Sequence, residues 1–115
     1  MYAVALKFPN SFLKNTVFIF YGETPSSVFR KFIEIQDIER HVLNIREYID
    51  MNKREDDYNF TEEIYNRSMG DIDISSNELK RFFDLCPEVC FLIEYCIGDN
   101  VVEDFKIKYP NSLIT

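Results

Sequence analysis

The sequence predicts an α+β fold: one antiparallel sheet, built from N-terminal and C-terminal hairpins, packed against a long helix and two shorter helices on one face. Strand-like runs lie at both ends of the 115-residue chain, and apolar residues recur with helical spacing in the middle. Hydrophobic residues make up 46% of the chain, which is enough for a core. The length suits a single domain over residues 1–115.

The N-terminal hairpin is predicted from two runs of strand-forming residues. YAVALKF (2–8) and TVFIFY (16–21) are rich in β-branched and aromatic side chains, which strands favour. The segment PNSFLKN connects them, and Gly22 ends the second strand.

A long helix is predicted over residues 25–51. Thr24, Ser26 or Ser27 can cap its start, and Pro25 suits the first turn. Whether the helix is continuous or broken near residues 36–37 stays open. Apolar residues recur three or four positions apart, which places them on one helical face: Val28, Phe32, Ile35, Ile38, Val42, Ile45 and Ile49.

Two shorter helices are predicted after a polar break at residues 52–59. The first spans 61–70, with Thr61 as its cap and Gly70 at its end. Ser75 and Glu78 have the spacing of a capping box and begin the second, which Pro87 ends.

The C-terminal hairpin is predicted from residues 88–97 and 101–109, joined by a turn at 98–100. The first run is apolar and rich in β-formers. The second alternates, with one side predicted to face the core: Val101, Phe105, Ile107 and Tyr109.

All three cysteines lie in FFDLCPEVCFLIEYC, residues 82–96, with C-x3-C-x5-C spacing. Structural zinc sites need four ligands and usually show C-x2-C or C-x4-C pairs, so a metal site would have to combine Cys86, Cys90 and Cys96 with His41, the only histidine. A C-x-x-C redox motif is missing. Because free cysteine is among the most buried residue types, we predict packing roles, with Cys90 and Cys96 on the same side of their strand as Leu92. No cofactor or metal is predicted.

Catalytic motifs are missing from the sequence. It contains no G-x-S-x-G, no H-E-x-x-H and no Gly-rich phosphate loop, with three glycines in all. DIDIS (71–75) resembles the opening of a calcium loop, but Ser76 and Phe82 stand where that loop requires Gly and Glu. We therefore predict that the protein is not an enzyme.

The net charge of −7 limits the partners. An acidic surface disfavours nucleic acid and anionic membranes, and the natural partner of an acidic protein is a basic one. The N-terminus MYAVALKFPN has no signal-peptide pattern, and no apolar run approaches the ~20 residues that a bilayer crossing needs. The sequence thus predicts a cytoplasmic protein. It does not predict an oligomeric state.

The excess negative charge is concentrated in one segment. Residues 55–78 hold eight acids and one base, net −7, whereas the other 91 residues hold 12 acids and 12 bases. Aromatic side chains lie among these acids, and aromatics with carboxylates suit the binding of a basic protein. A solvated acidic connector is the alternative. The predicted partner-binding residues are Glu55, Asp56, Asp57, Tyr58, Glu62, Glu63, Tyr65, Asp71 and Asp73.

With its small size and its segment EDDYNFTEEIYNRSMGDID, the chain resembles the bacterial immunity proteins that neutralise nuclease toxins of colicin and contact-dependent growth-inhibition systems. The resemblance implies an inhibitor of a basic toxin domain, a nuclease. These proteins share no common fold, so the resemblance assigns no residue roles. Three alternatives stay open: a phage- or virus-encoded inhibitor of a host basic protein, a small enzyme or metal protein using Cys86, Cys90, Cys96 and His41, and a structural subunit of a larger complex.

Overall fold

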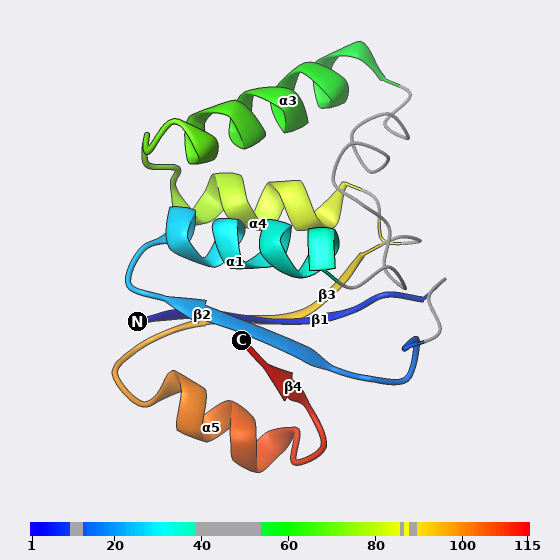
Figure 1. Ribbon diagram of the computed structural model, residues 1–115, viewed down its shortest axis with the longest axis vertical. Helices are drawn as coiled ribbons and strands as arrows, with labels where there is room; N and C mark the ends of the chain where they lie inside the picture. Colours follow the sequence, from blue (N-terminus) through cyan, green and yellow to red (C-terminus); the bar gives the residue numbers. More distant parts are fainter. Residues whose placement is uncertain (10–12, 39–53, 86, 88–89) are drawn as a thin grey trace.

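The computed structural model describes residues 1–9, 13–38, 54–85, 87 and 90–115 (Figure 1). The predicted α+β class is confirmed by a four-stranded sheet and the helices that pack on it. In chain order the described elements are β1 (Tyr2–Lys7), β2 (Phe18–Gly22), α1 (Pro25–Ile38), α3 (Glu55–Met69), α4 (Ser76–Asp84), β3 (Phe91–Ile97), α5 (Val101–Lys108) and β4 (Leu113–Ile114).

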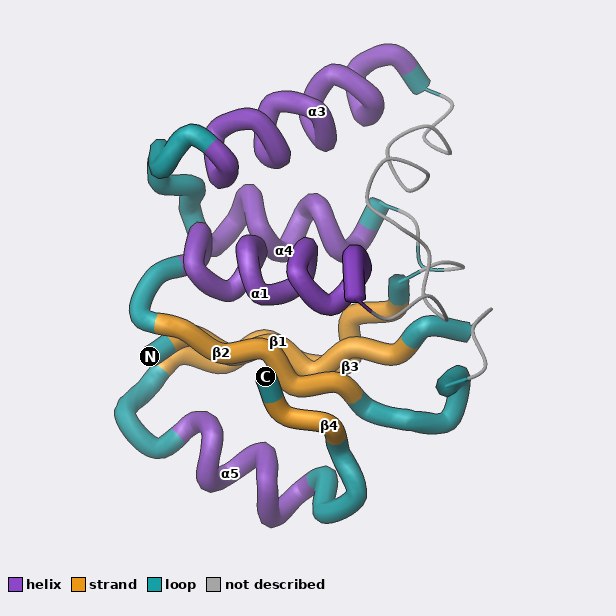
Figure 2. Tube along the Cα trace, in the orientation of Figure 1, coloured by secondary structure: helices purple, strands orange, loops and turns teal. Residues whose placement is uncertain are grey.

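The sheet has the strand order β3-β1-β2-β4. β1 is antiparallel to both β2 and β3, so the predicted N-terminal hairpin and the predicted joining of strands from the two ends of the chain are confirmed. β4 is parallel to β2, which makes the sheet mixed (Figure 2).

The predicted C-terminal hairpin is wrong. Residues 101–108 form the helix α5, not a strand. Its buried residues Val101 and Phe105 are four apart, a spacing that fits both a helix and alternate positions of a strand. Ile107, which the strand pattern places in the core, is 81% exposed. Because β3 and β4 both run antiparallel to β1, their connection is a parallel crossover, which requires a longer segment such as a helix.

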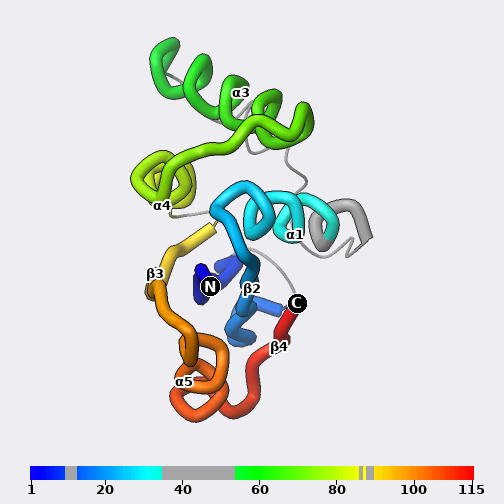
Figure 3. Tube along the Cα trace, turned by 90° about the vertical axis from the view of Figure 1, so that its left-hand side faces the viewer, coloured from blue at the N-terminus to red at the C-terminus, as the bar shows by residue number. Residues whose placement is uncertain are grey.

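The prediction that the helices cover one face of the sheet is therefore also wrong. α1, α3 and α4 lie on one side and α5 lies on the other, which Figure 3 shows with the sheet seen end-on. The side chains of β1 alternate between the two cores. Val4 and Leu6 face the larger core under α1 and α4, whereas Ala3 and Ala5 face the smaller core that contains Phe105.

The larger core is built from phenylalanines, and Phe32 of α1 lies at its centre. The Phe32 ring is 5.1 Å from that of Phe83 and 5.9 Å from that of Phe20, both edge-on. It also stacks on Phe8 at 6.2 Å. Edge-to-face ring pairs add stabilisation beyond the area they bury, so this cluster ties the sheet to both α1 and α4.

Local signals explain where α1 begins. The hydroxyl of Thr24 accepts a hydrogen bond from the Ser27 amide, and the hydroxyl of Ser27 accepts one from the Thr24 amide, each at 3.1 Å. Pro25 opens the helix, as predicted. A Cβ on the buried Gly22 would lie 2.1 Å from the Ser27 oxygen, so glycine lets the helix start directly against the end of β2. Residues 39–51 of the predicted long helix lie outside the described residues.

The shorter helices were predicted with unequal success. α4 is confirmed, with the reciprocal capping box between Ser75 and Glu78. α3 begins at Glu55, six residues before the predicted start at Thr61, so the predicted polar break is wrong for residues 55–59. Its first turn carries three acids, Glu55, Asp56 and Asp57. Negative side chains stabilise the positive end of the helix dipole, which explains why a polar stretch is helical.

Candidate partner-binding surface

The acidic segment forms α3, the described helix that lies farthest from the sheet, and the turn that follows it. α3 lies on top of α1 and α4, on the side remote from the sheet (Figure 1). Its inner face buries Thr61, Ile64 and Ser68, which recur at helical spacing. This buried stripe is narrow, and most of the remaining helix surface is half-buried or exposed.

The two predicted tyrosines belong largely to the inner side of α3. Tyr58 and Tyr65 are half-buried and pack against the larger core. Part of each ring is therefore already covered within the chain, which reduces the area either can offer a partner.

The predicted acids of α3 divide by exposure. Glu55, Asp56 and Glu63 are exposed, whereas Asp57 and Glu62 are half-buried. Asp57 is 3.8 Å from the guanidinium of Arg81 on α4. Within the described part of the chain, Glu55 and Asp56 form no ion pair, so their carboxylates are available to an external cation.

The turn after α3 is tied to α1. Asp71 has a positive φ of 59° and forms an ion pair with Arg30 of α1. Three residues further on, the amide of the buried Ile74 donates a hydrogen bond of 3.0 Å to the hydroxyl of Ser26, also on α1. Asp71 and Asp73 are both exposed, so the turn extends the acidic surface beyond the end of the helix.

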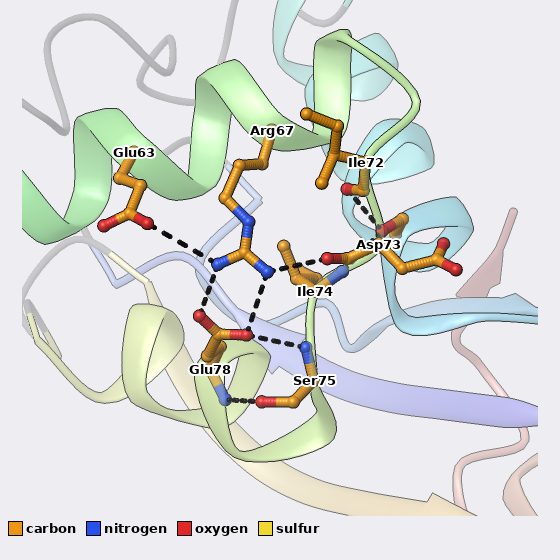
Figure 4. Close-up of polar contacts among 8 residues, drawn as sticks. Glu63, Arg67, Ile72, Asp73, Ile74, Ser75 and Glu78 are labelled. Atoms are coloured by element: carbon orange, nitrogen blue, oxygen red, sulfur yellow. Dashed lines mark hydrogen bonds and ion pairs between the residues drawn. The ribbon is translucent and has the colours of Figure 1, made fainter.

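Arg67 joins α3 to α4 (Figure 4). Its guanidinium donates to both carboxylate oxygens of Glu78, at 2.6 and 3.4 Å, and to the backbone oxygen of Asp73 at 2.7 Å. Glu63 approaches the same guanidinium at 3.7 Å. Burial alone would raise the pKa of Glu78, but hydrogen bonds from Ser75 and Arg67 outweigh it and lower this pKa. Glu78 therefore stays ionised, and its carboxylate holds α3 and α4 together through Arg67.

Two arginines that sequence reasoning missed reduce the charge of the segment. Arg30 and Arg81 reach it from α1 and α4. With Arg67, three cations face the eight acids of residues 55–78, and the local charge falls from −7 to −5. No sequence signal could have paired Arg30 with Asp71, because 41 residues separate them.

The cysteines are not brought together. Cys90 is fully buried in the larger core, and Cys96 packs half-buried on the opposite face, against the smaller core. The prediction that both share the side of Leu92 is wrong, because a register shift in the pairing with β1 inserts an extra residue between Leu92 and Cys96. Within the described ranges, no three His, Cys, Asp or Glu side chains could hold a metal ion. Cys86 and His41 lie outside those ranges.

A second polar cluster lies between β3 and α5. The carboxylate of Glu94 pairs with Lys108 and accepts a 2.7 Å hydrogen bond from the hydroxyl of Tyr109. Lys108 and then Tyr109 lower the pKa of Glu94, while burial and then Glu94 raise the pKa of Tyr109 to about 12. Burial, and then the same carboxylate, raises the pKa of the Cys96 thiol. The thiol is therefore poorly nucleophilic, although it lines a groove of about 310 Å³ beside α5.

Among the described helices, none combines the length and apolar character that a bilayer crossing requires. Comparison of the chain with protein-family models, with curated proteins and with solved structures finds no match.

Proposed function

We propose that this chain is an immunity-type inhibitor that binds and neutralises a basic toxin domain, a nuclease, through the acidic surface of α3 and the following turn. One observation carries the proposal: the whole excess negative charge of the chain falls in residues 55–78, and α3, which holds most of those acids, lies farthest from the sheet of the described helices. The inhibitor acts in the cytoplasm, where the free thiol of Cys96 persists.

The physical basis is charge complementarity. A nuclease binds the phosphate backbone of its substrate with lysine and arginine side chains. A surface rich in carboxylates attracts the same cations, which speeds encounter and suppresses unsuitable partners. Glu55, Asp56 and Asp73 support this role best, because they are exposed and form no ion pair within the described part of the chain. Asp57, Asp71 and Glu63 each have an arginine nearby, which a partner's cation would have to displace or share.

The test is capture of the partner followed by a protection assay. The affinity-tagged chain is expressed in its source cells, and retained proteins are identified by mass spectrometry. The proposal expects a basic domain that stops growth when expressed alone and does not when this chain is expressed with it. The proposal fails if no basic protein is retained, or if the retained protein is harmless alone.

A further inference from the structure

The outer edge of β3 is open in the described structure. β3 is the terminal strand of the sheet and pairs only with β1. Figure 3 shows α4 above this edge and α5 below it, with no described element lying alongside. The strand is seven residues long, and Phe91 and Ile97 at its ends are 48% and 60% exposed. An edge of this kind presents unpaired backbone groups to other chains.

The hydrogen-bond pattern shows which residues of β3 point outward. The amide of Gly98 donates to Met1, so residues 1, 3 and 5 of β1 bond to β3. The alternate residues, Tyr2, Val4 and Leu6, face β2 instead. Their partners across the β1–β3 register are Ile97, Tyr95 and Leu92, whose amides and carbonyls therefore point to the open edge.

The usual protection of an edge is weak in this strand. The sequence FLIEYCI contains no lysine and no proline, and its only charge, Glu94, is already paired with Lys108. The irregularity beside Ile93 is the single protective feature. The strand itself therefore carries no unpaired charge that would oppose the approach of an apolar strand.

We propose that β3 pairs antiparallel with β3 of a second copy, about a two-fold axis between Ile93 and Glu94, so that two four-stranded sheets become one. In this register Tyr95 lies opposite Leu92 of the second copy. Both residues point their backbone groups outward, so they can hydrogen-bond to each other across the axis. Both side chains pack on the face of the larger core, so the larger cores of the two copies lie on the same side of the joined sheet. A register centred on Glu94 would instead set Leu92 opposite Cys96, which lie on different faces.

The first test is the mass of the protein in solution, measured by light scattering and sedimentation equilibrium over its soluble concentration range. We expect a dimer for the wild-type chain and a monomer for Ile97→Lys, because a lysine on an edge strand opposes its pairing with another strand. Ile72→Lys is the matched control: its isoleucine is 57% exposed, against 60% for Ile97, and follows α3 away from the sheet edge. It should stay dimeric. A wild-type monomer, or equal behaviour of the two variants, overturns the proposal.

The second test fixes the register. Phe91 would lie opposite Cys96 of the second copy in a pair that is not hydrogen-bonded, where side chains are close enough for a disulfide. Within one strand the two residues are too far apart, because five residues span ~17 Å. Oxidation of Phe91→Cys at a pH high enough to ionise the Cys96 thiol, whose pKa is raised by burial, should therefore give a covalent dimer, and Phe91→Cys combined with Cys96→Ser should not. Failure of the first variant to cross-link, or cross-linking that persists without Cys96, overturns the register and the proposal with it.

Discussion

Replacement of Ser26 by alanine tests how the acidic turn is held on α1. The Ser26 side chain is fully buried, and its hydroxyl accepts a 3.0 Å hydrogen bond from the Ile74 amide. It also donates to the Ile72 carbonyl, at a longer 3.5 Å. Alanine keeps the Cβ and removes only the oxygen, so the change leaves almost no cavity and isolates the polar contact.

The magnitude follows from the burial of Ile74. Ile74 is only 4% exposed, so water cannot readily replace the lost acceptor of its amide. A buried donor left without a partner costs about 1–3 kcal/mol. The higher helix propensity of alanine returns at most a few tenths of this, because position 26 is in the first turn. We expect the free energy of unfolding to fall by about 1–2 kcal/mol.

The assay is urea unfolding, combined with hydrogen exchange at the Ile74 amide. Ser27→Ala is the control, because the described hydrogen bonds of the Ser27 hydroxyl go to Thr24 in the same turn. It should cost about 0.5–1 kcal/mol as the loss of a cap and leave exchange at Ile74 unchanged. A Ser26→Ala protein within about 0.5 kcal/mol of wild type, with Ile74 exchanging as slowly as before, would show that this hydrogen bond does not hold the turn on α1.

Phe32→Ala should lower the free energy of unfolding by about 3–5 kcal/mol, because it empties the centre of the larger core; the half-exposed Phe91→Ala should cost far less, and equal losses would contradict the packing described. The neutral form of Tyr109 is favoured by folding, so its contribution to stability is complete below the ordinary tyrosine pKa of 10 and is lost as pH rises through about 12. Tyrosinate absorbance should show a late component that Tyr109→Phe removes, and a titration unchanged by that substitution would argue against the Glu94 contact. For Glu94 the pKa is lowered, so the dependence on pH is reversed. The stability that its ionised form contributes is present above the ordinary carboxylate pKa and is lost as pH falls through the lowered pKa. Glu94→Gln should flatten the acid limb of the stability profile in urea unfolding, and an unaltered limb would contradict this.

Elements with local signals were predicted well from the sequence. Thr24 and Pro25 mark the start of α1, and Ser75 and Glu78 mark that of α4, because capping involves residues three positions apart. The first two strands were also predicted, since their β-branched and aromatic runs leave little doubt between strand and helix.

The errors arose where a pattern fits two structures or where the determining contact is distant. The spacing of Val101 and Phe105 suits either a helix or a strand, and only the crossover to β4 decides between them. The irregularity in β3 that separates Leu92 from Cys96 depends on pairing with β1, some 90 residues earlier in the chain. The acids of the candidate surface are visible as one segment of the sequence, but two of the arginines that partly neutralise them come from other helices.

The attraction that we propose between the acids of α3 and a basic partner is tested by the association rate constant of the captured partner. The rate is measured at low and physiological salt for wild type, for Glu55→Lys with Asp56→Lys, and for Glu103→Lys with Asp104→Lys. Both pairs are exposed acids in the first turn of a helix, so their substitutions disturb the helix dipole alike. Charge reversal on α3 should slow association at low salt by about tenfold or more and weaken the salt dependence of the rate. Charge reversal on α5 should have a much smaller effect on both. Equal rates for the two variants, or a wild-type rate that does not change with salt, would contradict the claim.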